Sequence, residues 1–431
     1  MKKPGPNPAI ARKFLASGLR RGALYLLLLP VYALSHLVPR DPRLWAFGSD
    51  DGRTFGGNAR YLADYVKRKL PGVRPVWFAS RPEACENARA AGLECVHPYS
   101  LRGIYRALRA GAYFITHHLF DVNPSVSGGA PVVQLWHGIP LKKIEFDTVE
   151  EGLYRRFLLA REPLGALFRR AHTFQKAHVV ATSEETARLF QKSFLVPRER
   201  IWITGYPRTD PLFRDDVTLL PAETRFLKTL DEVRARFPGV RLGLYAPTFR
   251  WLGQGPVEYF LSDPERMARL EAALEAANLA LWVKLHPWEA ERLRKAWPPS
   301  GYRRVFAWPE GLPDPHALLG RFDFLVTDYS SVFFDYLLTD RPIIFFAYDL
   351  EDYRKNSREL NFPYEEVTPG PKPNDFDAFL RTLQNLDAED AAWARERAAV
   401  RARFFAYQDG KSAARVTRRA ARMLGLEEPA D

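Results

Sequence analysis

Two adjacent serines, Ser330 and Ser331, are separated by three residues from Phe324–Val326, a short apolar run rich in residues that favour strands. Apolar residues at helical spacing begin at Val332, and a second buried strand, Ile343–Phe346, comes next. The pattern predicts a strand–helix–strand unit with the serines at the start of the helix, where backbone N–H groups are free. Two hydroxyls there can bind a phosphate, and the alternative is an ordinary helix cap.

Two histidines stand at equivalent places in the sequence. His137 follows the predicted strand Val132–Leu135, and His286 comes at the end of the predicted strand Leu281–Leu285. A histidine at the carboxyl end of a parallel strand can act as a general base or can donate a hydrogen bond to a transferring group. For His137 the alternative is a ring that only bonds a loop carbonyl. His117 and His118 end another strand, and at most one of these neighbours is expected to reach a site.

Polar residues follow predicted strands three times in the second half of the chain, at Thr248–Arg250, at His286 and at Ser330–Ser331. Open parallel sheets bind ligands beyond the carboxyl ends of their strands. Three such places in succession indicate a site for a nucleotide diphosphate.

These side chains need two sheets to position them. Strands and helices alternate along the chain, which predicts an α/β fold with two Rossmann-like domains. We expect these domains at residues 41–214 and 215–387, followed by helices at 388–431.

Composition limits the partners. The 431 residues carry a net charge of +12, which favours anionic lipid or a phosphate-rich substrate. Nucleic acid is not expected, because the charge is spread along the chain without an aromatic-basic recognition motif. Cys85 and Cys95 are expected to be reduced thiols of a cytosolic protein; the alternative is a single disulfide between them. Neither a CxxC pair nor an Asp-x-Asp motif suggests a metal.

The first 40 residues combine lysines and arginines with an apolar run, Ala23–Val38. The run is shorter than the roughly 20 residues that span a bilayer. It is predicted to be a membrane-associating segment on the cytoplasmic face; the alternative is a buried N-terminal helix. An Arg-rich amphipathic stretch at residues 153–172 is either a second membrane- or acceptor-binding element or a solvated helix.

Four motifs together resemble the CDP-glycerol glycerophosphotransferase family, which builds teichoic-acid-type polymers. They are Thr-Asp-Tyr-Ser-Ser at 327–331, Leu-Trp-His-Gly at 135–138, Ala-Pro-Thr-Phe-Arg at 246–250 and Lys-Leu-His-Pro at 284–287. The resemblance extends over residues 130–425, with a weaker similarity from about residue 44 onward. It implies that the two domains face each other across a cleft, the glycosyltransferase-B architecture, and that the helices at 388–431 cross back to the first domain.

The resemblance implies transfer of glycerol phosphate, or a similar polyol phosphate, from a CDP-activated donor to a hydroxyl of a lipid-linked cell-wall or capsule polymer, with release of CMP. His137 would take the proton of the acceptor hydroxyl, and His286 would stabilise charge on the transferring phosphate. The implied donor-binding residues are Thr248, Arg250, Lys284, Asp328, Ser330, Ser331 and Asp335, and Gly138, Lys142 and Lys143 would lie on the acceptor side. No cofactor beyond the CDP-polyol donor and no metal are expected.

Two other functions fit the same sequence. One is a two-domain glycosyltransferase that uses a nucleotide sugar. The other is a non-catalytic basic protein that binds anionic polymer at a membrane surface.

Overall fold

The computed structural model describes residues 28–148, 174, 176–250, 255–297, 301–312, 314–356 and 359–429. The chain forms two compact units. Unit 1 takes its described residues from Met1–His137, Ile144–Leu220 and Asp409–Asp431, and unit 2 takes its own from Gly138–Lys143 and Pro221–Gln408. The chain therefore passes between the units four times, and one passage falls directly after His137.

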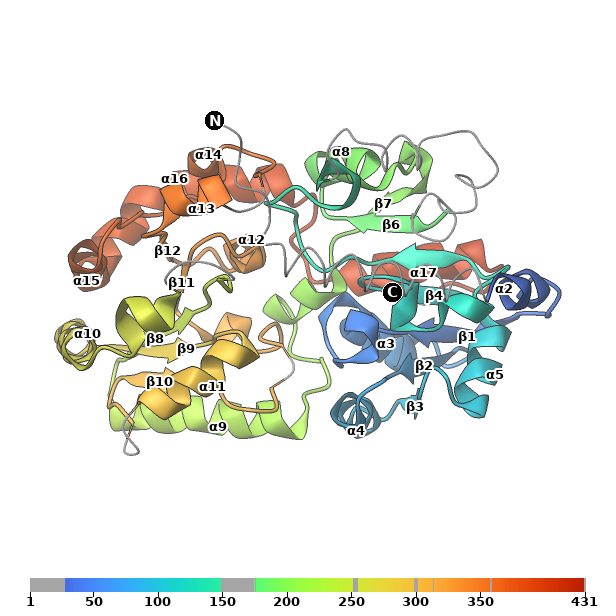
Figure 1. The fold of residues 1–431 in the computed structure, drawn as a ribbon, viewed down its shortest axis with the longest axis horizontal. Coiled ribbons are helices and arrows are strands. Elements are labelled where there is room, and N and C mark those ends of the chain that lie inside the picture. The colour runs from blue at the N-terminus through green and yellow to red at the C-terminus, as the bar shows by residue number, and fades with distance from the viewer. Residues whose placement is uncertain are drawn as a thin grey trace. The chain divides into compact units, whose positions relative to one another are not determined.

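Unit 1 contains a seven-stranded parallel sheet in the order β3-β2-β1-β4-β5-β6-β7 (Figure 1). Its strands are β1 (Asp41–Phe47), β2 (Arg74–Phe78), β3 (Glu94–Val96), β4 (Ala110–Ile115), β5 (Val132–Gln134), β6 (His178–Ala181) and β7 (Ile201–Ile203). Its helices are α2 (Leu29–Ser35), α3 (Gly57–Lys69), α4 (Pro82–Ala90), α5 (Leu101–Arg109), α8 (Glu184–Phe194) and α17 (Ser412–Met423). This is the Rossmann strand order, which reverses between β1 and β4.

The central strands of unit 1 are apolar on both faces, as expected where helices cover a parallel sheet on both sides. Trp45 and Phe47 of β1 stack on Phe114 of β4, and both pairs of ring centroids are 4.8 Å apart. The predicted strand Val132–Leu135 is confirmed as β5, which ends one residue earlier.

Unit 2 contains a five-stranded parallel sheet in the order β10-β9-β8-β11-β12, which also reverses once, between β8 and β11. Its strands are β8 (Arg241–Tyr245), β9 (Leu279–Val283), β10 (Val305–Ala307), β11 (Phe324–Thr327) and β12 (Ile343–Phe345). Its helices are α9 (Pro221–Arg236), α10 (Pro264–Ala276), α11 (Pro287–Ala296), α12 (Val332–Tyr336), α13 (Leu350–Asn356), α14 (Tyr364–Val367), α15 (Phe376–Gln384) and α16 (Leu386–Phe404). The parallel pairing of β11 with β12, Leu325 opposite Ile343, confirms the predicted strand–helix–strand unit.

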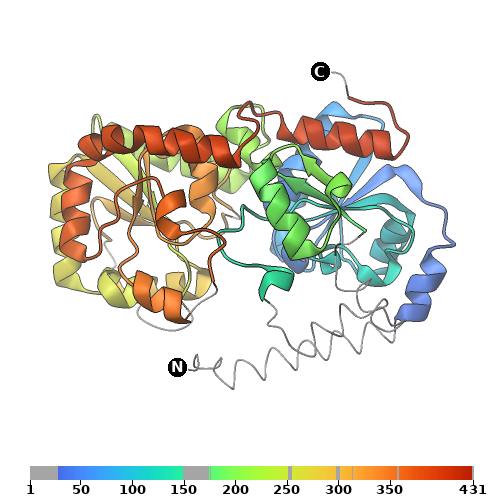
Figure 2. The same cartoon turned by 90° about the horizontal axis from the view of Figure 1, so that it is seen from above.

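The last two helices belong to different units, and Figure 2 shows α16 along unit 2 and α17 along unit 1. Asp210 accepts hydrogen bonds from the backbone N–H groups of Ser412 (2.9 Å) and Ala413 (2.8 Å), which lie at the start of α17. Such bonds satisfy N–H groups that the helix itself leaves without partners. The return to unit 1 therefore starts at Asp409, and α16 stays with unit 2.

The expectation of two reduced thiols is wrong. Cys85 on α4 and Cys95 on β3 form a disulfide. The turn between helix and strand brings their Cα atoms to 5.6 Å, within the range that a disulfide can bridge.

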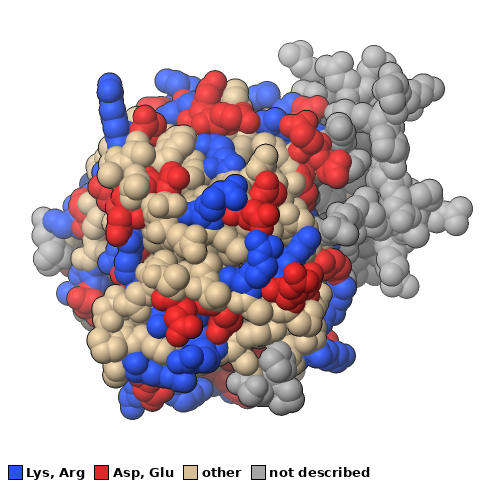
Figure 3. Space-filling view, turned by 90° about the vertical axis from the view of Figure 1, so that its left-hand side faces the viewer, with Lys and Arg blue, Asp and Glu red and all other residues tan. Residues whose placement is uncertain are grey.

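The predicted membrane-associating segment lies partly outside the described residues, and residues 153–172 lie wholly outside them. The described part of the predicted membrane-associating segment contains α2, on which Val31 and Leu34 are exposed. Among the described residues, no helix is long and apolar enough to cross a membrane. Figure 3 shows acidic and basic side chains interspersed over the face that carries α10 and α15, so the positive charge does not form one patch on that face.

Candidate active site

The candidate site residues of unit 1 lie where the strand order reverses. The loops that leave β1 and β4 meet there, and the segment that leaves β5 lies beside them. In open α/β sheets this is the place where ligands bind.

His137 is oriented by the backbone of the neighbouring strand. Its Nδ1 is 3.0 Å from the carbonyl oxygen of Thr116. Because a carbonyl oxygen only accepts hydrogen bonds, Nδ1 carries the proton of the neutral ring and Nε2 carries the lone pair. The alternative to a catalytic role was that the His137 ring only bonds a loop carbonyl. Such a bond is present, and it sets the tautomer that a general base needs.

The backbone around His137 is held by side chains from distant segments. Trp136 adopts φ = 56°, a left-handed conformation that is costly for a bulky residue. Asn58 donates to the carbonyl oxygens of Leu135 (3.0 Å) and Trp136 (2.8 Å), and Arg208 donates to that of His137 (2.6 Å). Gly138 follows with φ = 148°, which a residue with a side chain rarely adopts.

His117 stacks on His137, with ring centroids 4.2 Å apart and planes inclined by 10°. Its Nδ1 is 3.3 Å from the backbone nitrogen of Asp50 and 2.9 Å from the hydroxyl of Thr116. The backbone N–H only donates, so Nδ1 accepts and Nε2 carries the proton. Burial, with a smaller effect of His137, lowers the pKa of His117 to about 2, which keeps the ring neutral. His118 lies instead against the ring of Phe174, so the two neighbouring histidines have different surroundings.

Asp121 ties the loops of this site together. It is fully buried and accepts hydrogen bonds of 2.8 Å from the backbone N–H groups of Asp51, Thr116 and His117. Asp51 comes from the loop after β1, and the other two come from the end of β4. The sequence offered no signal for this residue, because its partners lie on two separate loops.

In unit 2, Asp328 joins the loops that follow β8 and β11. It is 1% exposed, accepts hydrogen bonds from the backbone N–H groups of Thr248 (2.9 Å) and Tyr329, and pairs with Arg250 at 2.7 Å. Asp328 was predicted to bind the donor. Its described contacts position the loops on which Thr248 and Ser330 stand.

Arg250 is buried among carboxylates and aromatic rings. Its side chain is 3% exposed, and its guanidinium pairs with Asp328 and, in bidentate fashion, with Asp349 (2.7 and 3.0 Å). The ring of Tyr329 lies 5.0 Å from the guanidinium carbon, and the Tyr329 hydroxyl donates to Asp349 at 3.0 Å. These ion pairs and ring contacts of Arg250 fix the loop. A contact of Arg250 with a phosphate stays a prediction.

Ser330 and Ser331 are half-buried, and their hydroxyls make no hydrogen bond with the residues that the structure describes. Ser331 is the N-cap residue of α12, but its side chain does not cap the helix. The helix-cap alternative is therefore not realised. The hydroxyl oxygen of Thr248 is buried nearby in the loop fixed by Asp328, and it too has no partner among the described residues. These neutral donors are available to a ligand.

Lys284 and His286 extend from the end of β9. Burial lowers the pKa of Lys284, and Asp314 opposes that shift. Burial and then the neighbouring Lys284 lower the pKa of His286, whose ring lies 4.5 Å from that of Phe249. At neutral pH His286 is therefore a neutral ring, which favours the hydrogen-bond donor over the imidazolium.

Asp335 is fully buried on α12 and lies 3.2 Å from Nε2 of His316, a residue that no sequence pattern singled out. Asp314 approaches the other ring nitrogen of His316 at 3.4 Å. This arrangement links α12 to the segment before β11. Asp335 therefore holds a structural position in the described structure, and its contact with the donor stays a prediction.

The residues predicted for the acceptor side pack within unit 2. Lys142 pairs with Leu360 in an isolated antiparallel bridge, and Asn361 donates to the carbonyl oxygens of Pro140 (2.8 Å) and Lys142 (3.0 Å). Lys143 pairs with Glu359. The ammonium of Lys142 lies 5.1 Å from the ring centroid of Tyr353, which itself stacks on Tyr329 at 3.8 Å. Lys142 is thus connected to the Arg250 cluster.

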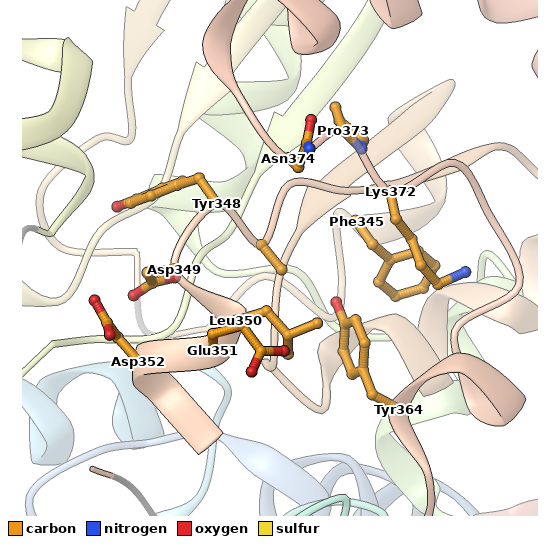
Figure 4. Close-up of a pocket in the computed structure, with 11 residues that line it drawn as sticks. Phe345, Tyr348, Asp349, Leu350, Glu351, Asp352, Tyr364, Lys372, Pro373 and Asn374 are labelled. Atoms are coloured by element: carbon orange, nitrogen blue, oxygen red, sulfur yellow. The ribbon is translucent and has the colours of Figure 1, made fainter. Parts of the chain in front are cut away.

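A pocket of about 350 Å³ opens beside this cluster, beyond the carboxyl end of β12. Figure 4 shows Tyr348 and Asp349 on one side of it and Phe345, Tyr364 and Lys372 on the other. Aromatic faces with a few polar groups suit a planar ligand that also forms hydrogen bonds. Among the described residues, no group of three or more His, Cys, Asp or Glu side chains could hold a metal ion.

Comparisons with known proteins agree with this geometry. The model of a family described as CDP-Glycerol:Poly(glycerophosphate) glycerophosphotransferase matches residues 30–421. The chain is 31% identical over 289 residues to the teichoic acid ribitol-phosphate polymerase TarL of Staphylococcus aureus, which covers 67% of this chain and 47% of that protein. It is 27% identical over 401 residues to the teichoic acid glycerol-phosphate transferase of the same organism, with 90% and 95% covered.

Two further comparisons concern length and fold. The teichoic acid poly(glycerol phosphate) polymerase of Staphylococcus epidermidis is 24% identical over 385 residues, and like TarL it is about twice as long as the matched region, with 49% of it covered. The solved wall teichoic acid polymerase TagF has a TM-score of 0.71 at 23% identity, with 95% of this chain and 98% of that chain covered. A putative UDP-N-acetylglucosamine 2-epimerase from Listeria monocytogenes gives a TM-score of 0.53 at 11% identity, with 90% and 98% covered.

The chain thus spans about half the length of the first curated relatives that it matches, and the solved structures show that the α/β fold with two parallel sheets is shared. Since the family model covers most of the sequence, the chain belongs to the CDP-glycerol:poly(glycerophosphate) glycerophosphotransferase family.

Proposed function

We propose that the protein transfers a polyol phosphate from CDP-glycerol or CDP-ribitol to a hydroxyl of a teichoic-acid-type polymer. The acceptor oxygen forms a bond to the β-phosphorus of the donor, the bond from that phosphorus to the CMP oxygen breaks, and CMP leaves with the electron pair. The names of the relatives support this reaction, as does a structure of the TagF polymerase soaked with CDPG.

The observation that carries the proposal is the fixed tautomer of His137. With Nδ1 bonded to the carbonyl of Thr116, Nε2 takes the proton of the attacking hydroxyl. The hydrogen bonds that Asn58 donates to the carbonyl of Leu135 and Arg208 donates to the carbonyl of His137 keep the ring in place before the substrate arrives. Such positioning, together with electrostatic stabilisation, supplies most of the catalysis in phosphoryl transfer.

We propose that unit 2 binds the donor. The hydroxyls of Ser330 and Ser331, which make no hydrogen bond with the described residues, would donate to the pyrophosphate oxygens. The buried hydroxyl of Thr248 and the neutral ring of His286 would donate to them as well. Lys284 would add positive charge. In this proposal the two units face a shared cleft, so that the base of unit 1 reaches the donor held by unit 2, and no metal or further cofactor takes part.

Membrane association is the second part of the proposal. Besides Val31 and Leu34, Leu37 follows α2 with 79% of its surface exposed. Leu101 and Tyr105 are also exposed on α5, a helix that carries Arg102, Arg106 and Arg109, and both helices pack against Pro124–Val126. Exposed apolar side chains beside arginines are typical of a surface that rests on anionic lipid. We infer that these residues hold the enzyme on the cytoplasmic face of the membrane, near a lipid-linked acceptor.

The test is CMP release from CDP-glycerol and from CDP-ribitol, with and without a lipid-linked acceptor. We expect acceptor-dependent release that falls at least a hundredfold in His137→Ala and in His286→Ala. His97→Ala is the matched control, because His97 is exposed and follows β3, the edge strand that lies three strands from β4 in the sheet. Full activity of the parent in EDTA is expected as well.

Other outcomes would redirect the proposal. Release from UDP- or GDP-sugars but from neither CDP-polyol would establish the glycosyltransferase alternative. Binding of anionic polymer that survives both histidine replacements, without turnover of any donor, would establish the non-catalytic alternative.

A further inference from the structure

The stacked rings of His117 and His137 form a pair with opposite hydrogen-bonding character. Within the described residues, both Nδ1 atoms are bonded at the end of β4, to different groups of Thr116. The Thr116 carbonyl forces a proton onto Nδ1 of His137, whereas the N–H of Asp50 requires a lone pair on Nδ1 of His117. The remaining ring nitrogens are therefore an acceptor, Nε2 of His137, and a donor, Nε2–H of His117.

We propose that this pair binds the end of the acceptor polyol through two adjacent hydroxyls, and that His117 is a further catalytic residue that contacts the hydroxyl beside the attacking one. The inference rests on the proposed function. Nε2 of His137 takes the proton of the attacking hydroxyl, and Nε2–H of His117 donates to the oxygen of its neighbour. The two rings are 4.2 Å apart, so one vicinal diol can contact both.

The surroundings of His117 fix which of its ring nitrogens accepts a hydrogen bond and which donates one. Asp50 and Asp51 both have positive φ (52° and 53°), so the loop that presents the N–H of Asp50 is held in an unfavourable backbone conformation. Asp121 maintains that conformation by accepting from the N–H of Asp51, and it also accepts from the N–H of His117. The Thr116 hydroxyl contacts Ser49 at 3.0 Å as well. A ring with only a structural role would not need its outer nitrogen kept as a neutral donor next to the base.

The arrangement has a chemical consequence. A vicinal diol has two oxygens that could attack, and the base removes a proton from the one that faces Nε2 of His137. A donor aimed at the neighbouring oxygen stabilises only the orientation in which the chosen hydroxyl faces the base. The pair therefore selects acceptors that end in a 1,2-diol, as glycerol phosphate and ribitol phosphate units do, over acceptors with a single terminal hydroxyl.

Two substitutions of His117 separate the donor role from a structural role. The amide oxygen of Asn can replace Nδ1 as the acceptor for the N–H of Asp50 but leaves no donor at the position of Nε2. The amide nitrogen of Gln can replace the Nε2–H donor but does not restore the bond to Asp50. The measurements are kcat and KM for a synthetic lipid-linked glycerol phosphate acceptor and for its analogue without the secondary hydroxyl, using the full chain.

With the diol acceptor we expect kcat/KM to fall about tenfold in His117→Asn and to stay within a few-fold of the parent in His117→Gln. With the deoxy analogue the parent should lose about tenfold, and His117→Asn should lose little more, because the hydroxyl and its donor act as one pair. The opposite order, Asn near the parent and Gln impaired, would assign His117 a purely structural role. Equal, additive losses for the enzyme and substrate changes would also overturn the inference.

Failure of the proposed function would look different. In that case the parent itself would release no CMP from CDP-glycerol or CDP-ribitol with either acceptor. An active parent whose discrimination between diol and deoxy acceptors is unchanged in His117→Asn would leave the transferase function intact and refute the histidine pair alone.

Discussion

Replacing Arg250 by Met separates two roles that this arginine could have. If Arg250 is mainly a ligand for the donor phosphate, the loss should appear in donor affinity and hardly in stability. If it is mainly the cation that holds the loops after β8 and β11, the loss should appear in the stability of unit 2. The structure favours the second role, because both carboxylates that contact the guanidinium accept hydrogen bonds from loop groups as well.

The expected magnitude follows from the burial of the ion pairs. The side chains of Arg250 and Asp328 are 3% and 1% exposed, so removal of the guanidinium leaves a buried carboxylate without its cation. Breaking a buried pair in this way typically costs about 3–5 kcal/mol. Arg269→Met is the matched control in the same unit: its side chain is 48% exposed, its partner Asp377 is exposed too, and the expected cost is about 0–1 kcal/mol.

Hydrogen exchange measured by mass spectrometry is the suitable assay, because it reports unit 2 separately from unit 1. We expect amides of β8 and β11 to lose protection by about 3–5 kcal/mol in Arg250→Met, while β1 and β4 keep theirs. Binding of CDP is measured on the same samples by calorimetry. A variant that keeps full protection but loses CDP binding would refute the structural role and restore the direct phosphate contact.

Three further results are expected. Burial and the nearby Glu258 raise the pKa of Glu289 from its usual 4.5 to about 7, so the folded state of the parent loses stability as pH rises between those values. In urea unfolding, Glu289→Gln should be more stable than the parent by on the order of 3 kcal/mol at pH 8 and no more stable at pH 4. A difference that does not depend on pH would show that ionisation of Glu289 is not the cause. Asp121→Ala leaves three backbone N–H groups without their acceptor, so amide hydrogen exchange at residues 49–57 should accelerate by the equivalent of roughly 3 kcal/mol. Unchanged exchange at these residues would show that Asp121 does not hold the loop. Asp210→Ala should cost about 1 kcal/mol and show itself as faster exchange in the first turn of α17, whereas a change confined to α16 would contradict the assignment of α17 to unit 1.

The positions of most strands along the chain and the strand-end positions of the candidate residues could be predicted from the sequence, because they depend on local patterns. Short apolar runs followed by Gly, Pro or polar residues located most strands of both sheets. The strand β10 was not predicted, because Val305–Ala307 is only three residues long and has no alternating pattern. The length of α12 was also not apparent, as five helical residues and a following 3-10 turn share the spacing of one longer helix.

The partners of the candidate residues could not be predicted, because they come from remote parts of the chain. Asp349 lies 99 residues from Arg250, and Arg208 lies 71 residues from His137. Likewise, the tautomer of His137 depends on a carbonyl of β4 and not on any neighbour along the chain.

The two units use the same device at their strand-order reversals. Asp121 in unit 1 and Asp328 in unit 2 are buried carboxylates, and each accepts hydrogen bonds from backbone N–H groups of both loops that flank the reversal. Their carboxyl oxygens are therefore used to fix loop geometry. The groups left to face a ligand are neutral donors, such as the hydroxyls of Ser330 and Ser331 and the ring of His117. Because a pyrophosphate is repelled by carboxylates and bound by such donors, a site whose acidic residues are occupied by its own backbone suits an anionic donor and a polyol acceptor.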